Sequence, residues 1–212
     1  LKPHLMVKIA LKEVGKRFNK EWVFKNVNYQ LEVGASYAIL GANGSGKSTL
    51  IQIIAGNITP SAGIITFIKD DEKIPDEKIF REVAIAAPYL ELIEEFTLTE
   101  LIKFHFRFKS MVKEVNEKDI PELLNLGLER NKPLKHYSSG MAQRVKLGLA
   151  IFSDCPVLLL DEPATNLDNN GISWYNDLIK KYAGNRLVVV CSNHRTDEYS
   201  FCKEELIMEN FK

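Results

Sequence analysis

The sequence has few cysteines and no long hydrophobic run. Its three cysteines, Cys155, Cys191 and Cys202, are an odd number without a CxxC pair. Cys155 and Cys191 adjoin apolar stretches, so we expect buried, reduced thiols of the kind found in a reducing cytosol. No stretch approaches the ~20 apolar residues that a membrane-spanning helix needs, and the N-terminus lacks the apolar core of a signal peptide. We therefore expect a chain that stays outside the membrane but is free to dock onto a membrane partner.

The chain also lacks an excess of charge of either sign. It has 212 residues, with 28 lysines and arginines against 28 aspartates and glutamates. Such a balance gives no broad positive field, so we expect no nucleic-acid partner. Hydrophobic residues make up 45% of the chain and charged residues 26%, as in folded proteins long enough to bury a real core.

Hydrophobic periodicity predicts an α/β chain. Apolar or alternating runs predict strands at 6–11, 22–31, 36–40, 157–160 and 187–191. Helical spacing predicts helices at 47–55 and 139–152 and further helices within 98–128, although Phe104–Phe108 alternates locally like a strand. Strand and helix alternate at both ends of the chain. We therefore predict a mainly parallel sheet with antiparallel strands at the N-terminus and a helical insertion in the middle.

A glycine-rich segment follows the strand predicted at 36–40. It reads Gly41-Ala42-Asn43-Gly44-Ser45-Gly46-Lys47-Ser48 and fits the pattern Gly-x-x-x-x-Gly-Lys-Ser/Thr. Glycines let the backbone curl so that its N–H groups surround phosphate oxygens, and the following helix adds its positive dipole end. We expect Lys47 to reach the β- and γ-phosphates, Ser48 to ligate Mg²⁺ and Thr49 to face the α-phosphate. The flanking strand and helix argue against a chance glycine turn, and we call residues 41–48 the phosphate loop.

Two acidic residues end the strand predicted at 157–160. Asp161 and Glu162 would lie at the carboxyl edge of the sheet, where open α/β sheets bind ligands. Asp161 suits the coordination shell of Mg²⁺, and Glu162 suits a base that polarises an attacking water. Alone, such a pair is equally compatible with a surface turn, but behind a phosphate loop it indicates nucleotide hydrolysis.

With these two motifs the chain resembles the nucleotide-binding subunits of ABC (ATP-binding cassette) transporters. Further motifs of that family follow in this chain in the family's order. Tyr137-Ser138-Ser139-Gly140-Met141-Ala142-Gln143-Arg144 is similar to the signature segment, and Pro163-Ala164-Thr165-Asn166-Leu167-Asp168 is similar to the D-loop. His194 resembles the switch histidine, Phe18 the aromatic that stacks on adenine, and Thr97–Glu100 the entry to the helical subdomain. Taken singly, the serines would be a helix N-cap, and His194 and Phe18 ordinary solvated or core residues.

The resemblance implies one P-loop NTPase domain over residues 1–212, with a helical subdomain at about 91–137. It implies ATP and Mg²⁺ as cofactors and a dimer of ATPase subunits. In that dimer Ser138, Ser139, Gly140 and Met141 close over the γ-phosphate held by the partner, and His194 contacts that phosphate in its own subunit. Asp168 falls at the family's D-loop aspartate.

Three positions depart from the family pattern. The Q-loop glutamine is replaced in Ala86-Ala87-Pro88-Tyr89, Ser139 replaces a signature glycine, and Met141 replaces its glutamine. Tyr89 lacks an amide oxygen. Its hydroxyl or Glu91 could substitute, or Tyr89 could instead contact the membrane partner. We expect a working ATPase with an altered coupling loop.

The leading hypothesis is the ATPase subunit of an ABC transporter, possibly an exporter, bound to a separate permease at the cytoplasmic face of a membrane. The alternative is a non-transport ABC-type ATPase in translation or DNA repair, which single-cassette length and neutral charge disfavour. A catalytically silent interaction module would be expected to lose Lys47 or Glu162. The chain ends soon after Glu205–Met208, so regulation by an added C-terminal domain is not expected.

Overall fold

The computed structural model describes residues 6–212; residues 1–5 of the predicted domain lie outside the described part. An antiparallel sheet in the order β2-β1-β4-β5 forms one layer. It consists of β1 (Val7–Phe18), β2 (Glu21–Glu32), β4 (Ala62–Lys69) and β5 (Glu72–Lys73). The predicted end of the first strand at Leu11 is wrong. The strand passes through irregular pairing between Leu11 and Val14, where Glu13 has a φ of 53°, and this bulge interrupts the alternation that marked the strand.

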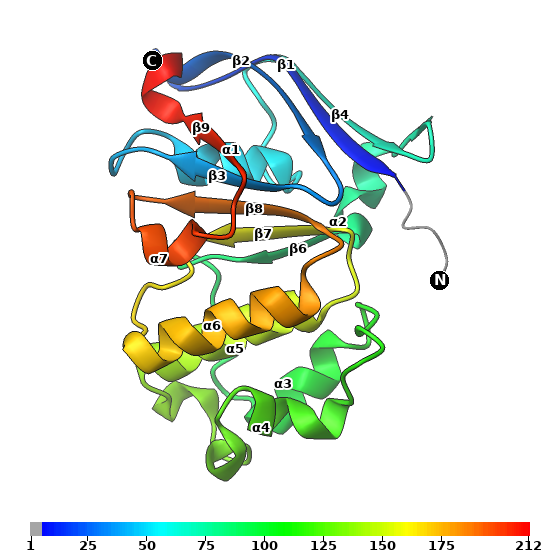
Figure 1. The fold of residues 1–212 in the computed structure, drawn as a ribbon, viewed down its shortest axis with the longest axis vertical. Coiled ribbons are helices and arrows are strands. Elements are labelled where there is room, and N and C mark those ends of the chain that lie inside the picture. The colour runs from blue at the N-terminus through cyan, green and yellow to red at the C-terminus, as the bar shows by residue number, and fades with distance from the viewer. Residues whose placement is uncertain (1–5) are drawn as a thin grey trace.

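A second sheet, entirely parallel, lies beneath the first. Its order is β6-β7-β8-β3-β9. It consists of β3 (Ser36–Leu40), β6 (Val83–Ala86), β7 (Val157–Asp161), β8 (Leu187–Ser192) and β9 (Glu204–Ile207). Periodicity predicted β3, β7 and β8 but missed β4, β6 and β9, which are short or partly exposed. The carboxyl ends of the strands point to one side, on the left in Figure 1.

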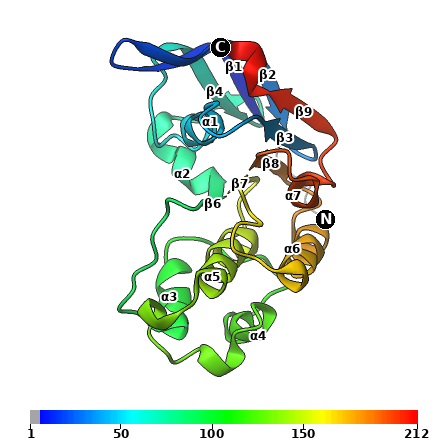
Figure 2. The same cartoon turned by 90° about the vertical axis from the view of Figure 1, so that its left-hand side faces the viewer.

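Helices cover both faces of the parallel sheet. Helix α1 (Lys47–Ile54) lies between the two sheets, and α5 (Ser139–Phe152) and α6 (Asn169–Tyr182) cover the opposite face (Figure 1). Helices α3 (Leu98–His105) and α4 (Ile120–Leu123) lie beyond α5 and α6, away from the antiparallel sheet (Figure 2). Two further helices are single turns, α2 (Ile79–Glu82) and α7 (Thr196–Tyr199). The 3₁₀ turns are Asp76–Lys78, Glu117–Asp119, Gly127–Glu129, Leu134–His136 and Met208–Phe211.

Alternation along the central strands builds two hydrophobic cores. Leu158 and Leu160 of β7 pack toward α5 and α6, whereas Val157 and Leu159 pack toward α1 and the antiparallel sheet. All four side chains are fully buried. A strand buried on both faces needs apolar residues at every position, which is why these runs are continuous rather than alternating. Cys155 and Cys191 are buried and free, as expected, while Cys202 is partly buried.

The helical insertion is more broken than its sequence pattern indicates. Helix α3 begins at a capping box, in which the Thr97 hydroxyl accepts from the Glu100 N–H and the Glu100 carboxylate from the Thr97 N–H. It ends at His105, and the chain turns through Phe106–Phe108, so the alternation of aromatics there marks the end of a helix. Beyond it, α4 has only four residues. Packing rather than helix propensity holds such short segments. No helix in the described part of the chain has the length and apolar character needed to cross a bilayer.

Candidate functional site

Strand register brings the predicted phosphate loop, acidic pair and histidine to one edge of the parallel sheet. Leu40, which precedes the phosphate loop, pairs with Ser192, and Asp161 pairs with Cys191. Strand β8 lies between β3 and β7, so the residues that follow these three strands are neighbours. This carboxyl edge is where open α/β sheets bind ligands.

The phosphate loop leads into a helix whose N-terminus is open. Gly46, the N-cap of α1, has a φ of 104°, which an L side chain rarely adopts. A Cβ there would also lie 2.8 Å from side-chain atoms of both Val23 and Phe24. No side chain caps α1 and its first turn contains no acidic residue. Its first N–H groups and its dipole are therefore available to an anion.

The Lys47 side chain folds back over the phosphate loop. It is only 4% exposed, and its Nζ donates to the carbonyl oxygens of Gly41 at 2.7 Å and Ala42 at 3.1 Å. Among residues 6–212 Lys47 forms no ion pair. A buried ammonium held by neutral carbonyls is a strong electrostatic attractor for phosphate.

Asp161 is a buried carboxylate without hydrogen-bond partners. It is 1% exposed, and within the described chain neither of its oxygens has a partner of adequate geometry. The pKa of Asp161 is raised to about 6. Burial is the main cause and the Glu162 charge adds to it, while the nearby Ser48 hydroxyl and Lys47 act in the opposite direction. Unpaired carboxylate oxygens beside a serine hydroxyl fit a hard divalent cation, which takes oxygen ligands.

The Ser48 and Asp161 oxygens suit Mg²⁺ better than a metal whose ligands all come from protein side chains. In the described residues no three His, Cys, Asp or Glu side chains gather into a metal-binding group. Mg²⁺ in nucleotide sites typically takes one or two protein oxygens, with phosphates and waters completing the shell. Ser48 and Asp161 meet that requirement.

Glu162 and His194 both lie on left-handed backbone just beyond their strands. Their φ angles are 45° and 56°. The Glu162 N–H donates to the Cys191 carbonyl at 2.9 Å, which ties the end of β7 to β8. Glu162 is partly buried and His194 exposed. Non-glycine residues in this region cost free energy, so the surrounding structure must hold both turns in place.

The signature segment packs against the D-loop of its own chain. Ser138 caps α5, its hydroxyl accepting from the Met141 N–H at 3.2 Å. A Cβ at Gly140 would lie 2.8 Å from the Asn166 carbonyl oxygen, so only glycine allows this approach. Ser139 is the first residue of α5, and its φ is not positive. Across residues 6–212 no hydrogen bond joins the signature segment to the phosphate loop.

Further contacts join α5 to the D-loop. Gln143 donates from Nε2 to the Pro163 carbonyl at 2.9 Å, and Arg144 approaches Asp168 at 3.8 Å. Asp168 itself caps α6 by accepting from the Gly171 N–H at 2.7 Å. The signature segment and D-loop therefore form one unit, packed through α5.

Tyr89 follows β6, the neighbour of β7, and lies near the acidic pair. It is 41% exposed, and burial, with a smaller effect from the Asp161 charge, raises the pKa of Tyr89 above its usual range. Phe18 ends β1 with half of its surface exposed, as a platform for a stacked base requires. Lys16 lies over its ring, with Nζ 5.2 Å from the centroid. The Val23 side chain lies against the backbone at Gly46, a contact that the sequence pattern did not reveal.

A second set of contacts to the phosphate loop was not predicted. The 3₁₀ turn Met208–Phe211 places the Glu209 carboxylate against the loop, where Oε1 accepts from the Ala42 N–H at 2.8 Å. That hydrogen bond is the main cause of a lowered pKa for Glu209, with smaller effects from His194 and Lys47. Lys212 Nζ donates to the Gly44 carbonyl at 3.3 Å. No motif marks these residues, because only folding brings the end of the chain to the loop.

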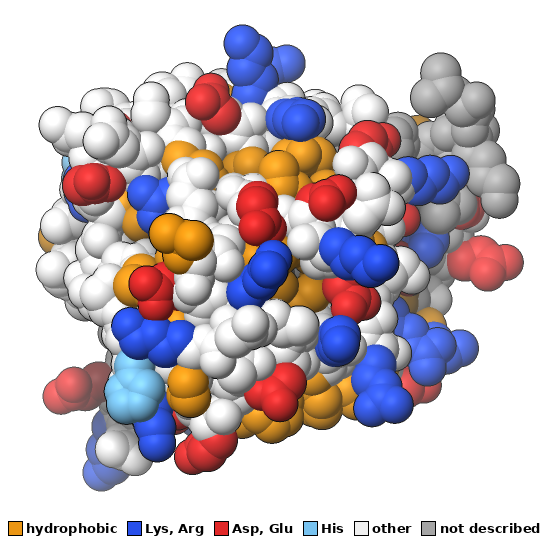
Figure 3. Space-filling view, turned by 90° about the horizontal axis from the view of Figure 1, so that it is seen from below, with side chains coloured by type: hydrophobic (Ala, Val, Ile, Leu, Met, Phe, Trp, Pro, Cys, Tyr) orange, Lys and Arg blue, Asp and Glu red, His pale blue; other side chains and the backbone are white. Residues whose placement is uncertain are grey.

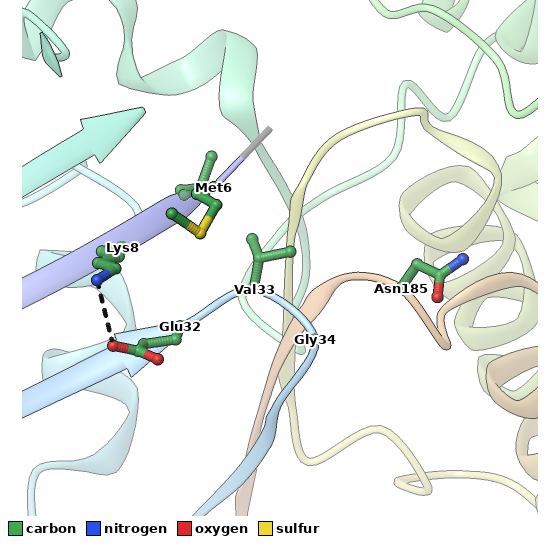
Figure 4. A pocket seen from close by; sticks show the side chains of 7 residues that line it. Met6, Lys8, Glu32, Val33, Gly34 and Asn185 are labelled. Carbon is green, nitrogen blue, oxygen red and sulfur yellow. Dashed lines mark ion pairs between the residues drawn. The ribbon is translucent and has the colours of Figure 1, made fainter. Parts of the chain in front are cut away.

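A cavity of about 260 Å³ lies at the other end of the same strands (Figure 4). It opens beside Gly34, which precedes β3, whereas the phosphate loop follows β3. The two charged side chains in it, Lys8 and Glu32, pair with each other at 3.7 Å. This cavity is separate from the site at the carboxyl edge. Its lining consists of Met6, Val7, Lys8, Glu32, Val33, Gly34 and Asn185.

Comparison with known proteins finds matches over most of the chain. The sequence model of the family described as "ABC transporter" matches residues 24–165. An uncharacterized ABC transporter ATP-binding protein of Bacillus subtilis, YybJ, is 30% identical over 206 residues, covering 95% of this chain and 93% of its own. The lantibiotic transport ATP-binding protein SrtF of Streptococcus pyogenes is 28% identical, covering 90% and 81%.

Solved structures show the same fold. The dimeric structure of MJ0796, a bacterial ABC transporter cassette, superposes with a TM-score of 0.77 at 26% identity, covering 94% of each chain. A putative ABC transporter ATP-binding protein from Pyrococcus furiosus superposes with a TM-score of 0.79 at 20% identity, covering 97% of this chain and 99% of that one.

Proposed function

Because this chain belongs to the ABC transporter family as an ATP-binding, ATP-hydrolysing subunit, we propose that it drives outward transport through a separate membrane permease. The observation that carries the catalytic part is the meeting of three features at one sheet edge. These are the uncapped N-terminus of α1, the buried Lys47 ammonium and the Asp161 carboxylate, which is buried and has no partner of adequate geometry among residues 6–212. Together they supply donors, charge and a cation ligand for a nucleoside triphosphate.

The residues divide the work by position. The N–H groups of Gly44–Thr49 bind the phosphates and Lys47 neutralises their charge. Ser48 and Asp161 hold Mg²⁺, which supplies further neutralisation of the β- and γ-phosphates when bound. Glu162 accepts the proton of the attacking water, and His194 donates to the γ-phosphate and keeps water and base in line. Phe18 stacks on the base.

Two such subunits complete each other's sites. In the single chain the signature segment contacts the D-loop and forms no hydrogen bond to the phosphate loop, within residues 6–212. We assign Ser138, Ser139, Gly140 and Met141 to the ATP held by the partner subunit, with the free hydroxyl proton of Ser138 available to the γ-phosphate. ATP then holds the dimer together and its hydrolysis releases it.

The permease docks on the helical end of the molecule, and the subunit sits at the cytoplasmic face. That end carries charges of both signs among hydrophobic side chains (Figure 3). Its exposed hydrophobic residues include Ile93, Phe104, Phe108 and Leu128. Aromatic residues such as Phe104 and Phe108 are enriched at protein interfaces, which supports a docking role for this end. A lantibiotic-like cargo is the first to test, because SrtF is named for lantibiotic transport.

Replacing Glu162 by Gln tests the catalytic assignment. The amide keeps the shape but accepts no proton, so we expect kcat for ATP to fall at least ~100-fold while ATP binding persists. Gel filtration should then show an ATP-dependent dimer that wild type forms only transiently. Glu72→Gln, an exposed change on β5, is the control and should match wild type. Undiminished hydrolysis by Glu162→Gln would overturn the role of Glu162.

A further inference from the structure

A buried carboxylate outside the predicted site lies between the segments that carry Glu162 and His194. Glu198 of α7 is 1% exposed. One of its oxygens, Oε1, accepts from the Ala164 N–H at 3.1 Å, and the other, Oε2, accepts from the Ser192 hydroxyl. Ala164 stands two residues after Glu162, and Ser192 stands two residues before His194. A single side chain therefore connects both turns.

The surroundings of Glu198 hold it in place. From α6, the Tyr175 hydroxyl donates to the Glu198 carbonyl at 3.0 Å. The Arg195 N–H donates to the Ser192 hydroxyl at 3.1 Å, which extends the network to the residue after His194. Arg195 also approaches Oε1 at 4.0 Å, and Asp197 lies nearby. Burial raises the pKa of Glu198, the bonds from Ser192 and Ala164 and the Arg195 charge lower it, and Asp197 raises it.

The two turns need such support because their backbone is strained. Glu162 and His194 both have positive φ angles, and a non-glycine residue keeps such a backbone conformation only when its surroundings enforce it. The Glu198 carboxylate bonds to Ala164 and Ser192 rather than to Glu162 or His194, so it holds the backbone beside each turn and leaves both side chains free. A hydrogen bond buried in a low-dielectric environment is costly to break.

We propose that Glu198 is a positioning residue for ATP hydrolysis. It fixes the turn at 162–164 and the turn at 192–194 relative to each other, and thereby the relative placement of Glu162 and His194. The inference rests on the roles proposed above for Glu162 and His194. It assigns Glu198 no contact with nucleotide. ATP binding at the phosphate loop should therefore be preserved when Glu198 is changed, while turnover is not.

The test compares Glu198→Ala with Glu198→Gln, and Asp197→Asn serves as the adjacent control. Glutamine keeps an oxygen for the Ala164 N–H and a polar group for Ser192, whereas alanine removes both contacts. We expect Glu198→Ala to lower kcat at least ~10-fold with KM for ATP within about twofold, and Glu198→Gln to recover kcat to within about threefold of wild type. Rates are normalised to ATP-binding subunits by titration with a non-hydrolysable analogue.

A merely structural role would lower the melting temperature and the yield but leave kcat per ATP-binding subunit at the wild-type value. That result would overturn the proposal. Ser192→Ala provides a second route if Glu198→Ala fails to fold, and it should also lower kcat with KM preserved. Glu162→Gln is assayed in parallel. If it hydrolyses ATP normally, the proposed base is wrong; if it is inactive while Glu198→Ala and Ser192→Ala are normal, only the positioning role is wrong.

Discussion

Single side chains supply contacts around the phosphate loop that no motif announces. Lys47 and Ser48 sit where their motif implies, but the N–H of Ala42 is held by Glu209, 167 positions further along the chain. Phosphate binding needs a loop whose N–H groups are already directed inward, because ordering them on binding costs entropy. Glu209 therefore contributes to preorganisation of the loop without belonging to its sequence pattern.

Comparing Glu209→Ala with Glu209→Gln separates the hydrogen bond from the charge. Glutamine removes the charge but keeps an oxygen for the Ala42 N–H, whereas alanine removes both. Alanine alone loses the hydrogen bond to the Ala42 N–H, so we expect alanine to weaken ATP binding several-fold relative to glutamine. Calorimetric titration with ATP measures it, with Glu205→Ala on β9 as the control. Equal affinities for the two Glu209 variants would show that the hydrogen bond plays no part.

At the scale of elements, close backbone contacts at glycine and hydrogen bonds between buried or partly buried side chains fix the positions of the helices. The N-terminus of α5 meets the D-loop at Gly140, and α3 meets the end of α5 through His105, whose Nε2 lies 2.9 Å from the Ser153 hydroxyl. Both contacts join segments that are far apart in sequence. The His105 contact holds the insertion against the core, although the helices of the insertion are too short to be stable alone.

Gly140→Ala should separate the signature segment from the D-loop. The new methyl group would lie 2.8 Å from a backbone oxygen, so one of the two segments must move. We expect ATP binding by the single subunit to remain, and ATP-dependent dimerisation and kcat to fall at least ~10-fold. Gly184→Ala is the matched control, because no atom lies within 4 Å of its Cβ position. Dimerisation equal to wild type would count against the role of this approach.

His105 predicts how stability depends on pH. Burial, with a smaller effect from Lys109, lowers the pKa of His105 to about 4 from its ordinary 6.5. The unfolded chain therefore binds a proton near pH 6 that the folded chain does not, and stability is lost as pH falls from about 6.5 toward 4. The loss between pH 7 and pH 5 should be about 2 kcal/mol.

Denaturant unfolding at the two pH values measures this loss. In His105→Asn the residue does not titrate, so the loss should shrink by about that amount, while His136→Asn at an exposed position should keep the wild-type dependence. If His105→Asn loses as much stability as wild type, other groups cause the dependence.

At the scale of the whole molecule, the two halves of the chemistry are held apart. The phosphate loop, the acidic pair and His194 share the carboxyl edge of the parallel sheet, whereas the signature segment is packed on the D-loop through α5. In the dimer proposed above, the second subunit places its signature segment over the ATP of the first. In a two-fold symmetric dimer of this kind, the same surface patch of each subunit forms the interface with the other.

Mixing two inactive variants tests this arrangement. Lys47→Ala disables the phosphate loop and Gly140→Ala disturbs the signature segment, so a mixed dimer contains one site with both parts intact. We expect the mixture to hydrolyse ATP faster than either variant alone, up to roughly a quarter of the wild-type rate for random pairing. Steady-state ATPase measurements on mixtures at equal total concentration provide the comparison. No gain on mixing would contradict a site shared between two copies of this chain.

The sequence by itself predicted a phosphate-binding loop and the central strands. The glycines, lysine and serine of residues 41–48 fit a pattern in which each residue type has a physical reason, and β7 and β8 are continuous apolar runs because both of their faces are buried. It predicted poorly where the signal was not local. The bulge at Glu13 hid half of β1, and β9 is too short and exposed to be recognised.

Only the tertiary structure decided which residues support the site. Glu198 and Glu209 are acidic residues like many others in the sequence, and their importance comes from N–H groups that folding places beside them. The orphaned oxygens of Asp161 and the strained backbone of Glu162 and His194 likewise exist only in the folded chain. The physical reason is that motifs record short-range geometry, whereas burial, strain and hydrogen bonding between distant segments depend on how the sheets and helices pack.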